Sequence, residues 1–173
     1  MTLDVADIKR LLPHRYPILL VDRVVSVTPG ESLVATKAVT VNEPCYAAVP
    51  DSAGDHAYPA ALLIESWCQA AGLLICLDMP NPDVLANQVT LFVGITGLRL
   101  SGRVLPGDTL THHVRLVRAF GAEAMLGGES TVDGNVVMSV EYVVIALRPA
   151  GVTGMSEDRS LRGPQSMPAE ARS

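Results

Sequence analysis

The sequence predicts an α+β fold in which one antiparallel β-sheet wraps around a single long, buried helix. Three observations lead to this prediction. A continuous apolar segment, residues 59–79, has the composition of a helix; two segments rich in β-branched residues precede it; and four strand-like segments follow it. Consecutive strands joined by tight turns favour an antiparallel sheet over alternating βαβ units. A chain of 173 residues is long enough for one domain with a substantial core.

The N-terminal residues predict a short amphipathic helix, which Thr2 or Asp4 can cap and which a proline ends. Residues 18–27 and 32–41 follow as strands, and the turn sequence TPG between them predicts a β-hairpin. The next segment, residues 42–58, contains two prolines and a glycine and shows no periodicity. Loops of this length inside compact domains are often functional.

The central segment reads PAALLIESWCQAAGLLICLDM. Proline suits the first turn of a helix, and Ala, Leu, Ile and Met are good helix formers. A helix that is apolar on every face belongs in the interior of a protein or in lipid. Because Glu65 and Gln69 interrupt the segment and no Lys or Arg flanks it, we expect a buried helix and no membrane partner.

Glu65 is the only charged residue of this helix before Asp78. Burial of an unpaired carboxylate is costly, so such a group shifts its pKa, finds a partner or takes part in chemistry. Gln69 follows one turn later on the same face, where its amide can orient the carboxyl group. Glu65 is therefore a candidate general acid or base. The alternative is a solvated carboxylate that the helix dipole favours near the N-terminus.

After the helix, the strands are separated by the turn sequences LPGD, FG and DG, of which the last is typical of hairpins. From residue 149 onward the chain contains Gly, Pro, Ser and charges without a period. We therefore expect a domain of residues 1–148 and a disordered tail of residues 149–173. The four strands after the helix are predicted at residues 88–100, 109–119, 122–132 and 135–147.

Composition excludes several classes of function. A net charge of -5 and a pI near 5.3 argue against nucleic acid as the main partner, although Arg99 and Arg103 can form a local basic patch. The first ten residues have no signal-peptide core, so we expect a cytoplasmic protein.

Three cysteines without a CxxC pattern predict neither disulfides nor a zinc site. His112 and His113 alternate on a strand and cannot readily share a metal ion.

Several motifs carry a resemblance to a known family. The segment LLPHRYPILLVDRV, residues 11–24, resembles the opening of the β-hydroxyacyl-ACP dehydratases of fatty-acid synthesis. Further motifs agree in order, and the resemblance extends over residues 8–147. These motifs are VNEP at 41–44, LLIESWCQAAG at 62–72, FVGI at 92–95, VLPGD at 104–108 and VDGNVV at 132–137.

The resemblance implies a hotdog fold and the removal of water from a 3-hydroxyacyl chain held on acyl carrier protein. The elimination needs no cofactor, and we expect neither a cofactor nor a metal ion. In that family a loop histidine takes the proton next to the thioester carbonyl, and a helix carboxylate handles the departing hydroxyl. Glu65 matches that carboxylate and Gln69 matches the glutamine after it. Leu63 and Trp67 either line the acyl tunnel or pack in the core. The family forms dimers in which each site takes its histidine from one subunit and its carboxylate from the other.

The loop before the helix departs from the family pattern. The position of the family histidine holds Val49 when the sequence is aligned from VNEP, and Ala48 when it is aligned on the following proline. Neither side chain can transfer a proton. His56 is the only imidazole nearby, and we take it as the second candidate catalytic residue. His14 matches the opening segment, where its role is structural.

We interpret the chain as a dehydratase subunit acting on carrier-bound 3-hydroxyacyl thioesters in fatty-acid or polyketide biosynthesis. Four hypotheses remain open. The chain is one half of a heterodimer that contributes Glu65 to a site completed by a partner's histidine; it is a homodimeric enzyme that uses His56; it binds acyl thioesters without turnover; or it is a thioesterase. The first two require a hydro-lyase, and the last two do not.

Overall fold

The computed structural model describes residues 1–49, 55–77 and 88–149. The predicted tail therefore lies outside the described residues, except for Pro149, which ends the last strand. The last two residues of the predicted central helix, Asp78 and Met79, also lie outside them. No helix of the described part is long and apolar enough to cross a lipid bilayer.

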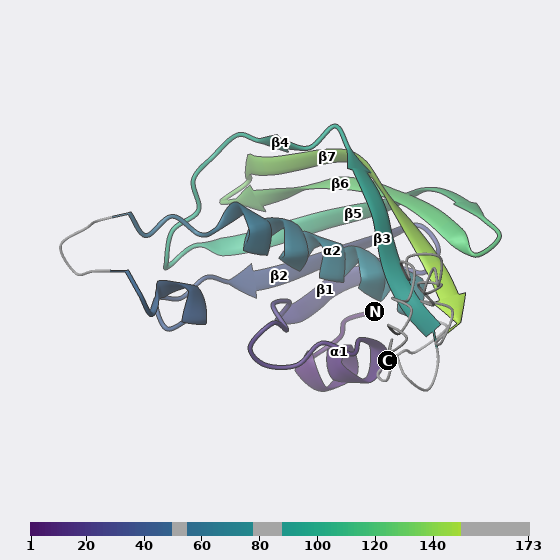
Figure 1. Cartoon of the computed structure of the whole chain (residues 1–173), viewed down its shortest axis with the longest axis horizontal. Helices are drawn as coiled ribbons and strands as arrows, with labels where there is room; N and C mark the ends of the chain where they lie inside the picture. The colour runs from purple at the N-terminus through teal and green to yellow at the C-terminus, as the bar shows by residue number, and fades with distance from the viewer. Residues whose placement is uncertain (50–54, 78–87, 150–173) are drawn as a thin grey trace, which may run out of the picture.

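The predicted α+β architecture is confirmed: an antiparallel sheet curves around one long helix, α2 (Figure 1). The sheet has the strand order β1-β2-β5-β6-β7-β3, and the short strand β4 pairs with β7. The helix α2 (Ala60–Cys76) contacts β2, β5 and β6, and a shorter helix, α1 (Val5–Leu11), packs beside it. The strands are β1 (Arg23–Thr28), β2 (Ser32–Ala38), β3 (Gln88–Thr96), β4 (Arg99–Leu100), β5 (Thr109–Phe120), β6 (Glu123–Val132) and β7 (Asn135–Pro149).

The N-terminal helix begins where the sequence predicts it. The Asp4 carboxylate accepts hydrogen bonds from the backbone N–H groups of Ala6 and Asp7, and the Asp7 carboxylate accepts one from the Asp4 N–H. This reciprocal capping box satisfies donors that have no partner inside the helix. Of the two predicted caps, Asp4 is the one that is used.

Two strand predictions are wrong in detail. The first strand begins at Arg23 and not at Ile18, because the backbone of the preceding residues bonds to a side chain of α2. The predicted strand at residues 88–100 divides into β3 and β4 at Gly97. Gly97 has a left-handed φ of 66°, and a Cβ there would lie 2.7 Å from the Cβ of Glu141. Only glycine fits this turn without strain.

The core lies between α2 and the concave face of the sheet. Trp67 is its largest fully buried side chain, and it packs against Gly128 in a β-bulge of β6. A Cβ on Gly128 would come within 1.9 Å of the His113 carbonyl oxygen, so the glycine lets the two strands approach. The sheet and Trp67 together fix how closely α2 approaches β5.

Candidate active site

Glu65 lies on α2 with its carboxyl group partly exposed and held by two side chains. Its Oε1 accepts a hydrogen bond from Gln69 Nε2 at 2.8 Å and lies 3.5 Å from His14 Nε2. The side chains of Glu65 and His14 are 35% and 29% exposed, respectively. Glu65 therefore neither faces bulk solvent freely nor lies unpaired in the core. A carboxyl group that is oriented by donors and still reachable is suited to acid-base chemistry.

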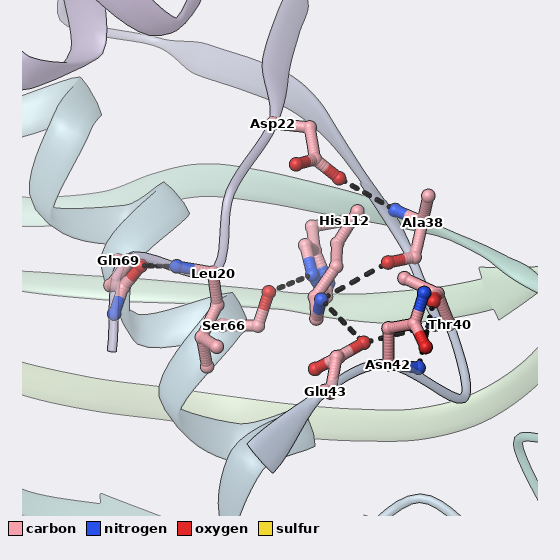
Figure 2. Close-up of polar contacts among 10 residues, drawn as sticks. Leu20, Asp22, Ala38, Thr40, Asn42, Glu43, Ser66, Gln69 and His112 are labelled. Carbon is pink, nitrogen blue, oxygen red and sulfur yellow. Dashed lines mark hydrogen bonds and ion pairs between the residues drawn. The ribbon is translucent and has the colours of Figure 1, made fainter. Parts of the chain in front are cut away.

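Gln69 is buried, and its amide is fixed at both ends. Its Oε1 accepts a hydrogen bond from the Leu20 N–H at 2.9 Å, and its Nε2 donates to the Ile18 carbonyl at 2.6 Å as well as to Glu65. Figure 2 shows the bond between Gln69 and Leu20. Because a carbonyl and an N–H fix its two ends, the amide can present only its NH₂ group to Glu65. The sequence-based expectation that Gln69 orients Glu65 matches this arrangement.

His14 is the side chain that the sequence did not place beside Glu65. Burial lowers its pKa, the charge of Glu65 opposes this effect, and Arg15 lowers the pKa further. His14 Nδ1 is buried and has no hydrogen-bond partner among the described residues. A buried donor without a partner is costlier than a buried acceptor, so the neutral ring carries its proton on Nε2 and directs it toward Glu65. The two residues are 51 positions apart, and no local pattern connects them.

His56 lies elsewhere in the described structure. Its ring centroid is 6.0 Å from that of Tyr46, and its neighbour Asp55 forms an ion pair with Arg103. Within the described residues, His56 has no hydrogen bond or ion pair with Glu65. In the single chain His56 therefore lies beside Tyr46 and not beside Glu65.

The two positions that match the family histidine are both apolar. Val49 is partly buried against the core, and its N–H donates to the carbonyl of Tyr46, which ends the 3-10 turn Pro44–Tyr46. Ala48 is exposed. Neither position supplies a group that can move a proton.

Leu63 and Trp67, the predicted substrate contacts, are 3% and 1% exposed. Trp67 Nε1 donates a hydrogen bond to the His113 carbonyl at 3.2 Å. In the single chain both side chains pack in the core.

A buried polar network under the first half of α2 was not predicted. His112 Nε2 lies 2.8 Å from Ser66 Oγ, and His112 Nδ1 lies 2.8 Å from Ser130 Oγ. Figure 2 shows Ser66 directed toward His112. Burial, with smaller effects from Lys37 and His113, lowers the pKa of His112 to about 3. The predicted alternation is confirmed, since His112 is buried and His113 is exposed. The two serine partners come from distant segments, and no local pattern indicates them.

A buried ion pair anchors the start of the loop. Lys37 Nζ lies 3.0 Å from Glu43 Oε1, and the same oxygen accepts a hydrogen bond from the Thr40 N–H. Lys37 Nζ also lies 5.4 Å from the centre of the Tyr58 ring, so strand β2 contacts both ends of the loop. Within the described residues, no three His, Cys, Asp or Glu side chains form a group that could hold a metal ion.

Comparisons with known proteins identify the family and the fold. The family model for FabA-like domains matches residues 12–141. The 3-hydroxyacyl-[acyl-carrier-protein] dehydratase FabZ of Anaeromyxobacter sp. (strain Fw109-5) is 39% identical over 83% of this chain and 89% of its own. Among solved structures, the dehydratase heterocomplex ApeI:P from Xenorhabdus doucetiae superposes with a TM-score of 0.67 at 18% identity, covering 84% of this chain and 92% of that chain. A hot-dog-like protein from Thermanaerovibrio acidaminovorans gives a TM-score of 0.55 at 16% identity, over 72% and 85% of the two chains.

Proposed function

The chain belongs to the FabA-like family and has the hotdog fold, and from this premise we propose that it is a hydro-lyase subunit acting on 3-hydroxyacyl chains. The substrate is held as a thioester on acyl carrier protein, and the product is the 2-enoyl thioester. We place the reaction in the cytoplasm, in fatty-acid or polyketide assembly. The relatives named as FabZ dehydratases support this reaction class.

The placement of Glu65 is the observation that carries the proposal. Dehydration breaks a C–H bond at the α-carbon and the C–O bond at the β-carbon, and the electron pair of the C–H bond forms the new double bond. One group must take the α-proton, and another must give a proton to the departing hydroxyl, which leaves as water. Glu65 is fixed by Gln69 and His14 and remains reachable, so we assign its protonated carboxyl group to the β-oxygen, to which it gives its proton and is left as the carboxylate.

The base that takes the α-proton has two candidate sources. In our first hypothesis the imidazole belongs to a partner subunit, because Val49 and Ala48 replace the family histidine in this chain. The solved structure named as a dehydratase heterocomplex supports a hotdog partner of this kind. In our second hypothesis His56 moves toward a Glu65 across a homodimer. Both hypotheses give Glu65 the same role.

The edge strand β3 supports association with a second hotdog subunit. Among the described residues it is the last strand of the sheet: one side of its backbone pairs with β7, and the other side pairs with no strand. Its apolar side chains Leu91, Phe92, Val93 and Ile95 are between 37% and 64% exposed. An exposed apolar edge strand readily pairs with another chain. We propose that β3 forms the dimer contact, with either a second copy or a related subunit.

The proposal is tested with a 3-hydroxyacyl chain loaded on acyl carrier protein and followed by mass spectrometry. The reaction is run with the purified chain alone, with its His56→Ala variant, and with a co-encoded hotdog protein. Water loss only in the mixture supports the heterodimer, whereas water loss by the chain alone that His56→Ala abolishes supports the homodimer. Release of free acid would identify a thioesterase, and binding of the carrier without any product would identify a binding subunit; either result contradicts the proposal.

A further inference from the structure

Polar side chains of α2 hold this helix at three nearly consecutive positions. Ser66 bonds to the His112 side chain, Trp67 bonds to the His113 carbonyl, and Gln69 bonds to the backbone of residues 18–20. Successive residues of a helix are about 100° apart, so the three positions cover an arc of about 160° around α2. We refer to Ser66, Trp67 and Gln69 with these partners as the polar clamp. Glu65 directly precedes it in the sequence.

His112 is the centre of the clamp on the side of the sheet. It is 0% exposed, and each ring nitrogen has a hydroxyl partner at 2.8 Å, Ser66 on α2 and Ser130 on β6. Its lowered pKa keeps the ring neutral at neutral pH, so one nitrogen donates and the other accepts. The serine hydroxyls can serve as donor or acceptor, which satisfies both nitrogens. The ring therefore joins two strands to the helix by directional bonds.

The distances in this cluster match those of a nucleophile, a base and an orienting group. Burial argues against that chemistry, because Ser66, His112 and Ser130 are each 0% exposed. A thioester cannot reach Ser66 Oγ in this packing. A neutral imidazole that resists protonation is also a weak base for a serine hydroxyl. The cluster therefore acts on the structure around it.

We propose that His112 is a positioning residue that sets the rotation of α2 through Ser66 and thereby places the Glu65 carboxylate. The effect on turnover rests on the proposed function, whereas the effect on the Glu65 position does not. A rotation of about 10° moves a group about 5.5 Å from the helix axis by about 1 Å. A misplacement of about 1 Å in a catalytic group can cost about 10²-fold in rate. Apolar side chains would fill the same space without fixing the rotation.

Two substitutions of similar chemistry separate positioning from packing. In His112→Gln the amide reaches about as far as Nε2 and can bond to Ser66. In His112→Asn it reaches only about as far as Nδ1 and can bond to Ser130. We expect His112→Gln to keep kcat within about threefold of the wild type and His112→Asn to lose about 10- to 100-fold in kcat with little change in KM. Arg115→Gln, on the exposed face of the same strand, is the control and leaves both values unchanged.

The triple variant Ser66→Ala/His112→Leu/Ser130→Ala tests whether apolar side chains that fill the same space are sufficient to keep Glu65 in position. It removes every polar group of the cluster at once, so none is left buried without a partner and the fold is retained. We expect a kcat loss similar to that of His112→Asn at an unchanged melting temperature. Wild-type kcat in both would overturn the inference.

The titration of His14 gives a readout that needs no turnover. The carboxylate of Glu65 raises the pKa of His14, so this pKa reports whether the two groups remain close. The chain has only four histidines, and the His112 variants have three, so proton NMR can follow each ring. We expect the pKa of His14 to fall in His112→Asn and in the triple variant and to stay at the wild-type value in His112→Gln.

These outcomes separate this inference from the proposed function. If no combination of subunits dehydrates the substrate, the proposed function fails, and the His14 titration still decides the positioning role. An identical His14 titration in all variants would overturn the inference even if the enzyme is active. Release of free acid that Ser66→Ala abolishes would also overturn it, since Ser66 would then be a nucleophile.

Discussion

Glu65 is the residue to which we assign the proton transfer at the β-oxygen. Its carboxyl group is partly exposed. Gln69 and His14 both contact Oε1 and restrict the orientation of the group. Glu65→Gln keeps the size of the side chain and an oxygen that can accept the Gln69 bond, but it removes the group that exchanges a proton. We therefore predict a loss of turnover of about 10²-fold or more at an unchanged melting temperature, measured by mass spectrometry and circular dichroism. Wild-type turnover in this variant would contradict the assignment.

His112 makes the fold sensitive to acid. Its pKa is about 3 in the folded chain and about 6.5 when solvated. Between these values the unfolded chain binds a proton at His112 and the folded chain does not, so the free energy of unfolding falls as the pH falls. The maximum slope is about 1.4 kcal/mol per pH unit.

We predict that His112→Gln removes this contribution. Between pH 7 and pH 5, the wild type should lose about 2 kcal/mol more unfolding free energy than the variant does. Urea denaturation at the two pH values measures the difference. The lowered pKa of His14 changes the free energy of unfolding equally in both proteins, so its effect cancels when the two are compared. An equal loss in both proteins would show that His112 is already solvated in the folded state.

At the scale of the elements, β2 holds the loop before α2 through the buried pair of Lys37 and Glu43. Their side chains are 6% and 12% exposed, respectively. Lys37→Met leaves the Glu43 carboxylate buried without its cation, and breaking such a pair costs about 3–5 kcal/mol. The double variant Lys37→Met/Glu43→Gln removes both charges and should recover part of this loss. Urea denaturation compares the three proteins, and a single variant as stable as the wild type would argue against the anchor.

The edge strand β3 is the element that we expect to join subunits. Val93 is 64% exposed on this strand, and Val117 is 44% exposed on the inner strand β5. Val93→Lys places a charge in the proposed contact and should raise the dissociation constant of the dimer by at least about tenfold. Val117→Lys is the matched control and should leave the dimer intact. Analytical ultracentrifugation measures both, and equal effects would exclude β3 as the contact.

The elements were predictable from the sequence wherever local pattern decides them. Buried and partly buried side chains alternate along β2, as expected for a strand with one face on the core, and the composition of residues 60–76 predicts the helix. The start of β1 was not predictable, because the Gln69 amide binds the backbone of Ile18 and Leu20 from about 50 residues away.

The same limit applies to the site. Glu65 and Gln69 share a helix face and could be paired from spacing alone. His14 and Ser130 come from distant segments, and only the folded sheet brings them to α2. The lone carboxylate in an apolar helix was the feature that indicated function, and the partners that orient it required the structure.

At the scale of the whole molecule, the chain supplies a fixed carboxylate and an apolar edge strand, but no imidazole in contact with Glu65 other than that of His14 in the described part. This division agrees with a site assembled from two subunits, one of which gives the proton to the departing hydroxyl. The role of Glu65 can then be tested apart from the identity of the base.

The most direct measurement compares two leaving groups in whichever subunit combination is active. A 3-chloroacyl thioester eliminates chloride, which needs no proton, whereas a 3-hydroxyacyl thioester must release water. We predict that Glu65→Gln loses about 10²-fold or more on the hydroxy substrate and retains its rate above background on the chloro substrate. An equal loss on both substrates, or no loss on either, would contradict the assignment of Glu65 to the β-oxygen.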